Sequence, residues 1–139
     1  MALDQLLLDS WTPRALGALR VVVGFLYLQH GTAKLFHVPH VAQFDGLRPI
    51  SIDGFAGMLE IVGSVLIVLG LFTHPVALIL SGEMAVAYFW VHAARGHVLM
   101  PALNGGEEAV LYCFIFLFLS IAGGGAWSID GLLAPTIVQ

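Results

Sequence analysis

The sequence contains very little charge. Only 10% of its 139 residues are Asp, Glu, Lys or Arg, whereas 59% are hydrophobic. A soluble domain of ordinary composition carries about 25% charged residues. Because so few charges cannot cover a water-facing surface, the composition predicts an integral membrane protein. The length is that of one domain, and we expect this domain to comprise residues 1–139.

Cysteine and clustered basic residues are also scarce. Cys113 is the single cysteine, so neither an intrachain disulfide nor a C-x-x-C thiol relay is expected. The net charge of −4 and the lack of a basic cluster argue against nucleic acid as a partner. The first charges, Asp4 and Asp9, are acidic, whereas a secretory signal begins with basic residues. We therefore expect a protein that keeps its N-terminus and has the lipid bilayer as a partner.

Four segments are apolar and long enough to cross a bilayer, which takes about 20 residues. They are residues 13–36, 54–72, 75–94 and 105–123. Thr12, Asp53 and Asn104 precede three of them and are residue types that favour helix N-caps. The sequence thus predicts an all-α membrane protein, a bundle of four transmembrane helices. Four spans place both termini on one side of the membrane, here called side A, and the longer loops on the other, side B.

Small and polar residues mark packing faces on the first two predicted helices. Residues at alternating intervals of three and four share one stripe of a helix. The first stripe consists of Gly17, Arg20, Gly24, Tyr27, Gly31 and Lys34, and the second of Ala56, Glu60, Gly63, Ile67 and Gly70. Since glycine lets a neighbouring helix approach closely, we expect Arg20 and Lys34 to face protein rather than lipid.

A buried partner is expected for Arg20. A cation at the centre of a bilayer costs about 2.5–3.5 kcal/mol on insertion scales. At a rise of about 1.5 Å per residue, Arg20 lies roughly 10 Å inside side A and Glu83 roughly 12 Å inside the same side. We therefore predict a structural ion pair between Arg20 and Glu83. A role of this pair in proton relay is the alternative.

A second polar group of residues collects toward side B. It consists of Tyr27, His30, Lys34, Glu60, Tyr88, His92 and Glu107. We predict that these residues form a quinone or proton site around Glu60, because a buried carboxyl can exchange protons near neutrality. Packing of Glu60 against Lys34 or a tyrosine is the alternative. For Glu107, the spacing from Asn104 matches a capping box, and Glu108 is expected to face elsewhere.

Histidine placement makes a metal site the weaker interpretation. His30 and His92 lie on different spans, and neither has a second ligand three or four residues away. No metal is therefore expected. Glu83 and His92 fall on nearly opposite faces of a regular third helix, so one of them is expected to face a second copy of the chain or a partner subunit.

Four segments follow one another in an order that is typical of a known family. They are "RVVVGFLYLQHGTAKLF", "GMLEIVGSVLIVLGLFTHP", "EMAVAYFWVHAARG" and "NGGEEAVLY". With these segments the chain resembles the DoxX family, small four-helix membrane proteins of bacteria and archaea. The recurring positions of that family fall on Arg20, Gly24, His30, Gly31, Lys34, Glu60, Met84, His92, Asn104, Gly105, Gly106 and Glu107. His74 departs from the pattern, since relatives often have Arg in this turn.

The resemblance implies a redox-linked role. Members of the family serve as the small membrane subunit of thiosulfate:quinone oxidoreductase or as partners of other oxidoreductases. The implied protein is a subunit rather than an enzyme alone, with quinone as the candidate cofactor and electrons supplied by a partner. A non-enzymatic scaffold, in which the polar residues only fix helix packing, is the alternative.

The resemblance also implies an inner (plasma) membrane location with cytoplasmic termini. The distribution of basic residues favours the opposite orientation, because side A has Arg14 whereas side B has Lys34, Arg48 and Arg95. We expect cytoplasmic termini on the strength of the resemblance.

Overall fold

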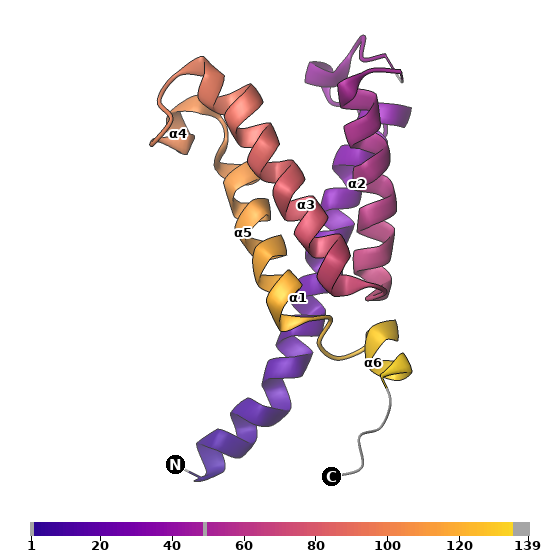
Figure 1. Ribbon diagram of the computed structural model, residues 1–139, viewed down its shortest axis with the longest axis vertical. Coiled ribbons are helices and arrows are strands. Elements are labelled where there is room, and N and C mark those ends of the chain that lie inside the picture. Colours follow the sequence, from indigo (N-terminus) through magenta and orange to yellow (C-terminus); the bar gives the residue numbers. More distant parts are fainter. Residues whose placement is uncertain (1, 49, 135–139) are drawn as a thin grey trace.

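The computed structural model describes residues 2–48 and 50–134, and this part of the chain is all-helical (Figure 1). The long helices are α1 (Ala2–Phe36), α2 (Ile52–Leu69), α3 (Thr73–Ala87) and α5 (Glu107–Ala122). The short helices are η1 (Ala42–Phe44), η2 (Tyr88–His92), η3 (Ala93–Arg95), α4 (Pro101–Asn104) and α6 (Ile129–Leu133). The predicted all-α fold is confirmed.

The four long helices coincide with the four predicted spans but begin elsewhere. α1 runs through Pro13, so Thr12 is not its N-cap. Proline lacks an N–H, and the carbonyl of Pro13 accepts the N–H of Ala126 from the other end of the chain. Ser51, rather than Asp53, caps α2, because its hydroxyl accepts the N–H of Gly54 at 3.1 Å.

Two helices of the described part are long and apolar enough to cross a membrane. They are α2 and the continuous helix Thr73–Arg95, which consists of α3, η2 and η3. That α1 and α5 also cross the bilayer stays a prediction. The beginning of α1 and the helix α6 lie at the same end of the molecule, the side A end, and η1 and η2 lie at the side B end (Figure 1).

The helices pack as two pairs, α1 with α2 and α3 with α5, which the α2–α3 hairpin connects (Figure 1). Glycine makes the close contacts. A methyl group added to Gly24 of α1 would lie 2.8 Å from Cγ2 of Val68, and one added to Gly63 of α2 would lie 2.7 Å from Cδ2 of Leu80. All glycines of the two predicted stripes are buried, so both stripes are confirmed as packing faces.

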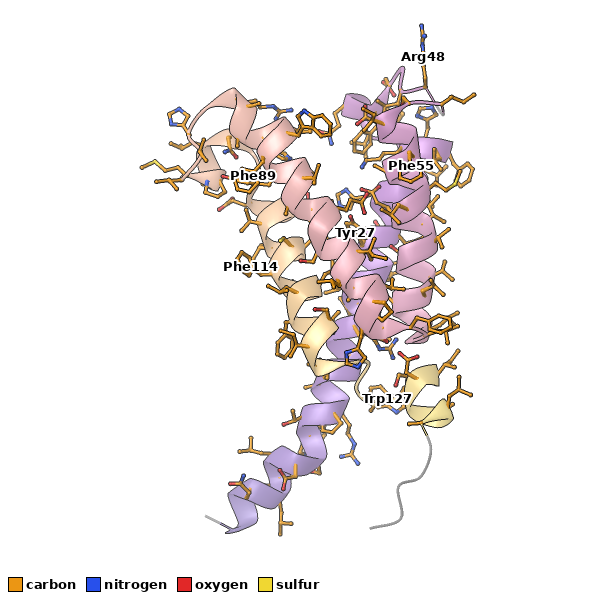
Figure 2. The ribbon with its side chains drawn as sticks, in the orientation of Figure 1. Tyr27, Arg48, Phe55, Phe89, Phe114 and Trp127 are labelled. Carbon is orange, nitrogen blue, oxygen red and sulfur yellow. The ribbon has the colours of Figure 1, made fainter. Side chains whose placement is uncertain are left out.

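The outer surface of the helices is apolar. Phe55, Phe89 and Phe114 point away from the molecule, with exposed fractions of 65–70%, whereas Tyr27 points inward and is 1% exposed (Figure 2). Apolar side chains outside and polar side chains inside are the arrangement that a lipid environment favours. The aromatic run of α5 therefore lies largely on the outer surface, with Phe116 as its buried member.

Arg20 is fully buried and binds main-chain carbonyls. Its guanidinium donates to Ile67 at 2.6 Å and to Val68, both near the end of α2. It also donates to Gly124 at 2.7 Å and to Trp127 at 3.0 Å, in the segment between α5 and α6. The last carbonyls of a helix lack intrahelical partners and carry partial negative charge. Arg20 thus caps α2 and joins three parts of the chain.

The predicted ion pair between Arg20 and Glu83 is wrong. The guanidinium bonds go to carbonyls, and Glu83 instead accepts a hydrogen bond from the hydroxyl of Tyr27 at 3.2 Å. The prediction took only acidic side chains as partners for Arg20. Free main-chain carbonyls at the end of α2 lie closer to Arg20, and they carry no signature in the sequence.

Asp130 of α6 secures the same end of the molecule. Its Oδ1 and Oδ2 accept the N–H groups of Phe72 and Thr73, each at 2.8 Å, at the start of α3. Its own N–H donates to the carbonyl of Gly70 at 2.8 Å. A carboxylate at a helix N-terminus satisfies free N–H groups and favours the helix dipole. α6 therefore holds the α2–α3 turn in place.

We predict that Arg20→Met lowers the free energy of unfolding by roughly 3–5 kcal/mol, because several buried carbonyls lose a charged donor. The matched control is Arg14→Met, since Arg14 is exposed and its guanidinium lies over the ring of Trp11. The measurement is thermal unfolding in mild detergent. Equal losses in the two variants would show that Arg20 does not hold the fold together.

A second prediction concerns acid stability. Partial burial raises the pKa of Asp130, but the hydrogen bonds from Thr73 and Phe72 outweigh it and hold the pKa below its ordinary value. The carboxylate therefore stabilises the fold above about pH 4, and this contribution is lost as the pH falls through the folded-state pKa. We expect Asp130→Asn to lower the melting temperature at neutral pH and to bring it closer to that of the wild type in acid. A melting-temperature difference that stays constant across the acid range would contradict this.

Candidate functional site

An ion pair joins α1 and α2 near the side B end. Lys34 Nζ lies 2.6 Å from Glu60 Oε1, and the two side chains are 15% and 2% exposed. Close packing of the two helices sets this register, since a methyl group added to Gly57 would lie 3.1 Å from Cβ of Lys34. The ammonium also lies 5.7 Å from the ring centroid of Phe44 in η1. The pairing of Glu60 with Lys34 is therefore present in the structure.

Glu83 of α3 faces Glu60 of α2. Gly63 of α2 and Leu80 of α3 contact one another across the antiparallel hairpin. Glu60 lies three residues before Gly63, and Glu83 lies three residues after Leu80. Because the two helices run in opposite directions, Glu60 and Glu83 lie at the same level of the hairpin. One oxygen of each, Oε2 of Glu60 and Oε1 of Glu83, is buried without a hydrogen-bond partner among the described residues. Such atoms are costly unless something donates to them.

Aromatic rings connect α1 to α5 at this level. The ring of Tyr27 lies 5.0 Å from that of Tyr112 and 4.9 Å from that of Phe116, between centroids. One turn nearer side B, His30 Nε2 lies 3.0 Å from Glu108 Oε1. The His30 and Glu108 side chains are 30% and 65% exposed, so this pair is the more exposed part of the site, toward side B. We call Tyr27, His30, Lys34, Glu60, Glu83 and Glu108 the central polar layer.

Tyr88 and His92 lie outside the central polar layer. The hydroxyl of Tyr88 donates to the carbonyl of Val98 at 2.6 Å and accepts from the amide of Asn104 at 3.3 Å. The ring of His92 stacks on that of Tyr88 at 6.4 Å, and its Nδ1 lies 3.4 Å from the carbonyl of Asn104. These contacts hold the loop between η2 and α5, which is a structural role.

A π-helical turn changes the direction of the third span. η2 is a π-helix from Tyr88 to His92, and such a turn contains one residue more than an α-turn would. The residues after it are therefore rotated relative to those of α3. Glu83 contacts Tyr27 of α1 and His92 contacts Asn104 of α4, so both have partners within the chain and neither gives a basis for a second subunit.

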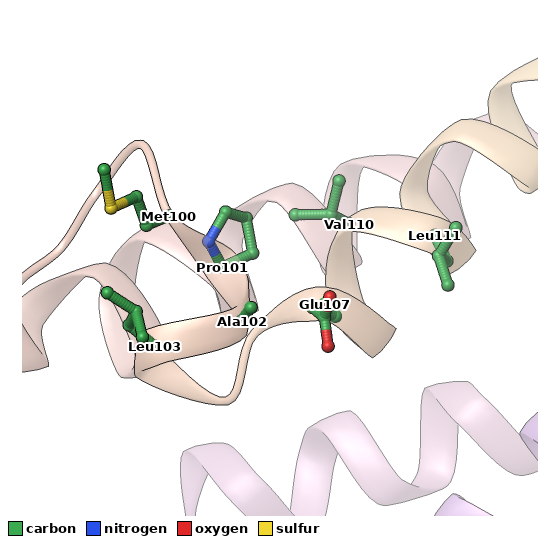
Figure 3. Close-up of a pocket in the computed structure, with 7 residues that line it drawn as sticks. All are labelled: Met100, Pro101, Ala102, Leu103, Glu107, Val110 and Leu111. Carbon is green, nitrogen blue, oxygen red and sulfur yellow. The ribbon is translucent and has the colours of Figure 1, made fainter.

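Glu107 also lies outside the layer. It is the first residue of α5, and the oxygen of the Asn104 side chain accepts from Gly106 at 2.9 Å, so the predicted capping box is wrong. The Glu107 side chain lines an outer groove of about 670 Å³ (Figure 3). The other residues that line this groove are Met100, Pro101, Ala102, Leu103, Val110 and Leu111. Of the seven predicted site residues, four thus meet in the layer and three do not.

The sequence interpretation missed two members of the layer. Glu83 was assigned to Arg20, and Glu108 was expected to face elsewhere. A signal for Glu108 existed, because Tyr112 follows it at the i+4 position and therefore shares its helix face. Ser64, one turn after Glu60 on α2, is also buried, and its hydroxyl has no hydrogen-bond partner in the described part of the chain.

The comparisons with known proteins identify the family. The sequence model of the DoxX family matches residues 15–93. A protein of Haemophilus influenzae, described as uncharacterized, is 43% identical over 126 residues, which cover 88% of this chain and 93% of the relative. The chain belongs to the DoxX family. No solved structure matches it. As a DoxX protein it is a membrane protein, and the matched range contains the α1, α2 and α3 residues of the central polar layer.

We predict strong coupling between Lys34 and Glu60 in a double-mutant cycle. Lys34→Met and Glu60→Met should each leave a buried charge without its partner, so each single change should destabilise the DoxX protein more than the double change does. The measurement is the free energy of unfolding in detergent. Arg20→Met and Glu83→Gln form the control cycle, and these should add, since the two side chains share no partner. Additivity in the first cycle would contradict the ion pair.

Proposed function

We propose that this DoxX protein is the membrane subunit of an oxidoreductase and holds a quinone or quinol headgroup at the central polar layer. In this proposal α1, α2, α3 and α5 form four transmembrane spans of one domain in the inner membrane. The observation that supports it best is the meeting of Lys34–Glu60, Tyr27–Glu83 and His30–Glu108 between two helix pairs whose outer faces are apolar.

The side chains of the layer have the chemistry that a quinone site needs. The two carbonyl oxygens of a quinone need hydrogen-bond donors, and its reduction needs a group that supplies a proton. The ammonium of Lys34 and the ring of His30 can donate, and the carboxyl of Glu60 can hold the proton. The rings of Tyr112 and Phe116 lie beside Tyr27, and aromatic rings are suitable neighbours for the flat quinone ring. Electrons would come from a partner subunit.

A non-enzymatic scaffold is the second candidate function, and the shape of the molecule favours it. Two hollows in the described part of the chain lie on the outer surface, away from the polar layer. One is the groove beside Glu107, and the other has a volume of about 370 Å³. Ala85, Val86, Phe89 and Trp90 line the second. Arg20 and Asn104 likewise have contacts that only hold helices and loops in place.

The proposal includes cytoplasmic termini, in line with the family resemblance. Lys34 does not report on orientation, because it is committed to Glu60 inside the protein. Arg48 and Arg95 at the side B end still outnumber Arg14 at the side A end. A C-terminal reporter fusion decides the orientation: activity of a cytoplasm-specific reporter supports the proposal, and activity of a periplasm-specific one reverses it.

The fourth prediction tests the quinone site. Solvent extraction of purified wild-type protein, followed by mass spectrometry, should yield a quinone together with phospholipid. Glu60→Gln should lose the quinone but remain folded, because the amide keeps the size of the side chain and can still accept from Lys34. Glu107→Gln is the matched control and should retain the quinone, since Glu107 faces the outer groove. Recovery of bulk phospholipid alone from the wild type would support the scaffold instead.

A further inference from the structure

We infer that Glu60 and Glu83 share one exchangeable proton, and that this proton exchanges with side B through His30 and Glu108. The inference holds whether or not a quinone binds, because it depends on the charges and hydrogen-bonding atoms of the chain itself. Four observations support it. Two concern the carboxyl groups: their charge relative to that of Lys34, and the one buried oxygen of each that has no partner among the described residues. The other two are the apolar packing toward side A and the contact of His30 with the exposed Glu108 toward side B.

Without a proton, the charges of Lys34, Glu60 and Glu83 do not balance, and the side chain of Glu60 is buried while those of Lys34 and Glu83 are half-buried. Lys34 brings one positive charge and Glu60 and Glu83 bring two carboxyl groups, all between packed helices. Lys34 offsets one carboxylate through its bond to Oε1 of Glu60. A second, uncompensated carboxylate in apolar surroundings is strongly unfavourable, and two adjacent carboxylates repel. One proton on the pair removes this charge and leaves the three groups together neutral.

The hydrogen-bonding pattern requires one more hydrogen at the same place. Oε1 of Glu60 already accepts from Lys34, and Oε2 of Glu83 already accepts from Tyr27. The oxygens left over, Oε2 of Glu60 and Oε1 of Glu83, belong to side chains that face each other across the hairpin. A protonated carboxyl is a donor and an ionised one is an acceptor. A single proton on the pair would supply the donor that these oxygens lack.

Other titratable groups surround the pair on every packed helix. Those near the pair are Tyr27, His30 and Lys34 of α1, Asp53 of α2 and Tyr112 of α5, and Glu108 of α5 lies beyond them, in contact with His30. Of these, His30 contacts the exposed acid Glu108, and its ring centroid lies 6.1 Å from that of Tyr27, whose hydroxyl donates to Glu83. The imidazole can accept a proton at one nitrogen and release one from the other, so it suits transfer between Glu108 and the buried pair.

Packing closes the side A direction. Below the carboxyl pair lie Val23, Ile67 and Leu80, which are 5%, 0% and 0% exposed, and below these lies the guanidinium of Arg20 with its carbonyl partners. In the side B direction, Glu108 is 65% exposed. Uptake of one proton from side B changes the charge of the carboxyl pair from two negative charges to one and involves no electron transfer.

Infrared spectroscopy of the purified protein at varied pH tests the shared proton. We expect a protonated-carboxyl band at neutral pH that shifts in heavy water, is lost in Glu83→Gln, and is unchanged in Glu107→Gln. Lys34→Met should roughly double the band, since neither carboxyl then has a cation. Absence of the band from the wild type would overturn the inference. Appearance of the band only after sodium is replaced by choline would also overturn it, since a sodium ion would then occupy the site.

Two further comparisons cover a variant that does not fold and the route of the proton. If Glu83→Gln does not fold, the wild-type band and its increase in Lys34→Met still decide. For the route, the rate at which the band exchanges in heavy water should fall by roughly tenfold or more in His30→Phe and in Glu108→Gln. Glu107→Gln again serves as the control. An unchanged rate in both layer variants would show that the proton does not pass through His30 and Glu108.

Discussion

The arrangement of this molecule depends on one buried guanidinium. Arg20 binds the last carbonyls of α2 and the segment that leads to α6, so the side A ends of the helices are fixed to one another. Asp130 adds the start of α3 to the same assembly. In an apolar medium each carbonyl that a helix leaves free is costly, and a planar group with five donors can serve several of them. This end of the fold is therefore rigid and closed.

The opposite end differs because its contacts are made by side chains. α1 and α2 remain in close contact along their glycines, but α1 reaches α5 through the rings of Tyr27 and Tyr112 and through His30 and Glu108. Contacts of this kind can rearrange without separating backbones that touch. The proposals place ligand binding and proton exchange at this end, toward side B, while the Arg20 end preserves the packing.

Sequence reasoning succeeded where helix periodicity decides the outcome and failed where main-chain geometry does. The stripes of Gly24, Gly31 and Gly63 could be predicted, because close packing in a membrane needs small residues at regular spacing. The partner of Arg20 could not, since free carbonyls are invisible in a sequence. His92 and Tyr88 were placed in the layer from their depth along the helix, which does not specify a direction, and both contact the loop before α5 instead. Membership of the DoxX family followed from ordered segments and was confirmed.

The number of carboxyl groups in the layer separates a ligand-binding role from simple scaffolding. A scaffold that joins α1 to α2 needs Lys34 and one acid, and Glu60 alone meets that need. Glu83 adds a second, half-buried acid, and one oxygen of each acid is buried without a donor among the described residues. An apolar residue in its place would pack α3 at lower cost. The excess acid therefore makes sense as the means of holding a proton, or a hydrogen-bond donor of a ligand, beside Lys34. On this reasoning the Lys34–Glu60 pair stabilises the layer, and Glu83 provides its capacity for exchange.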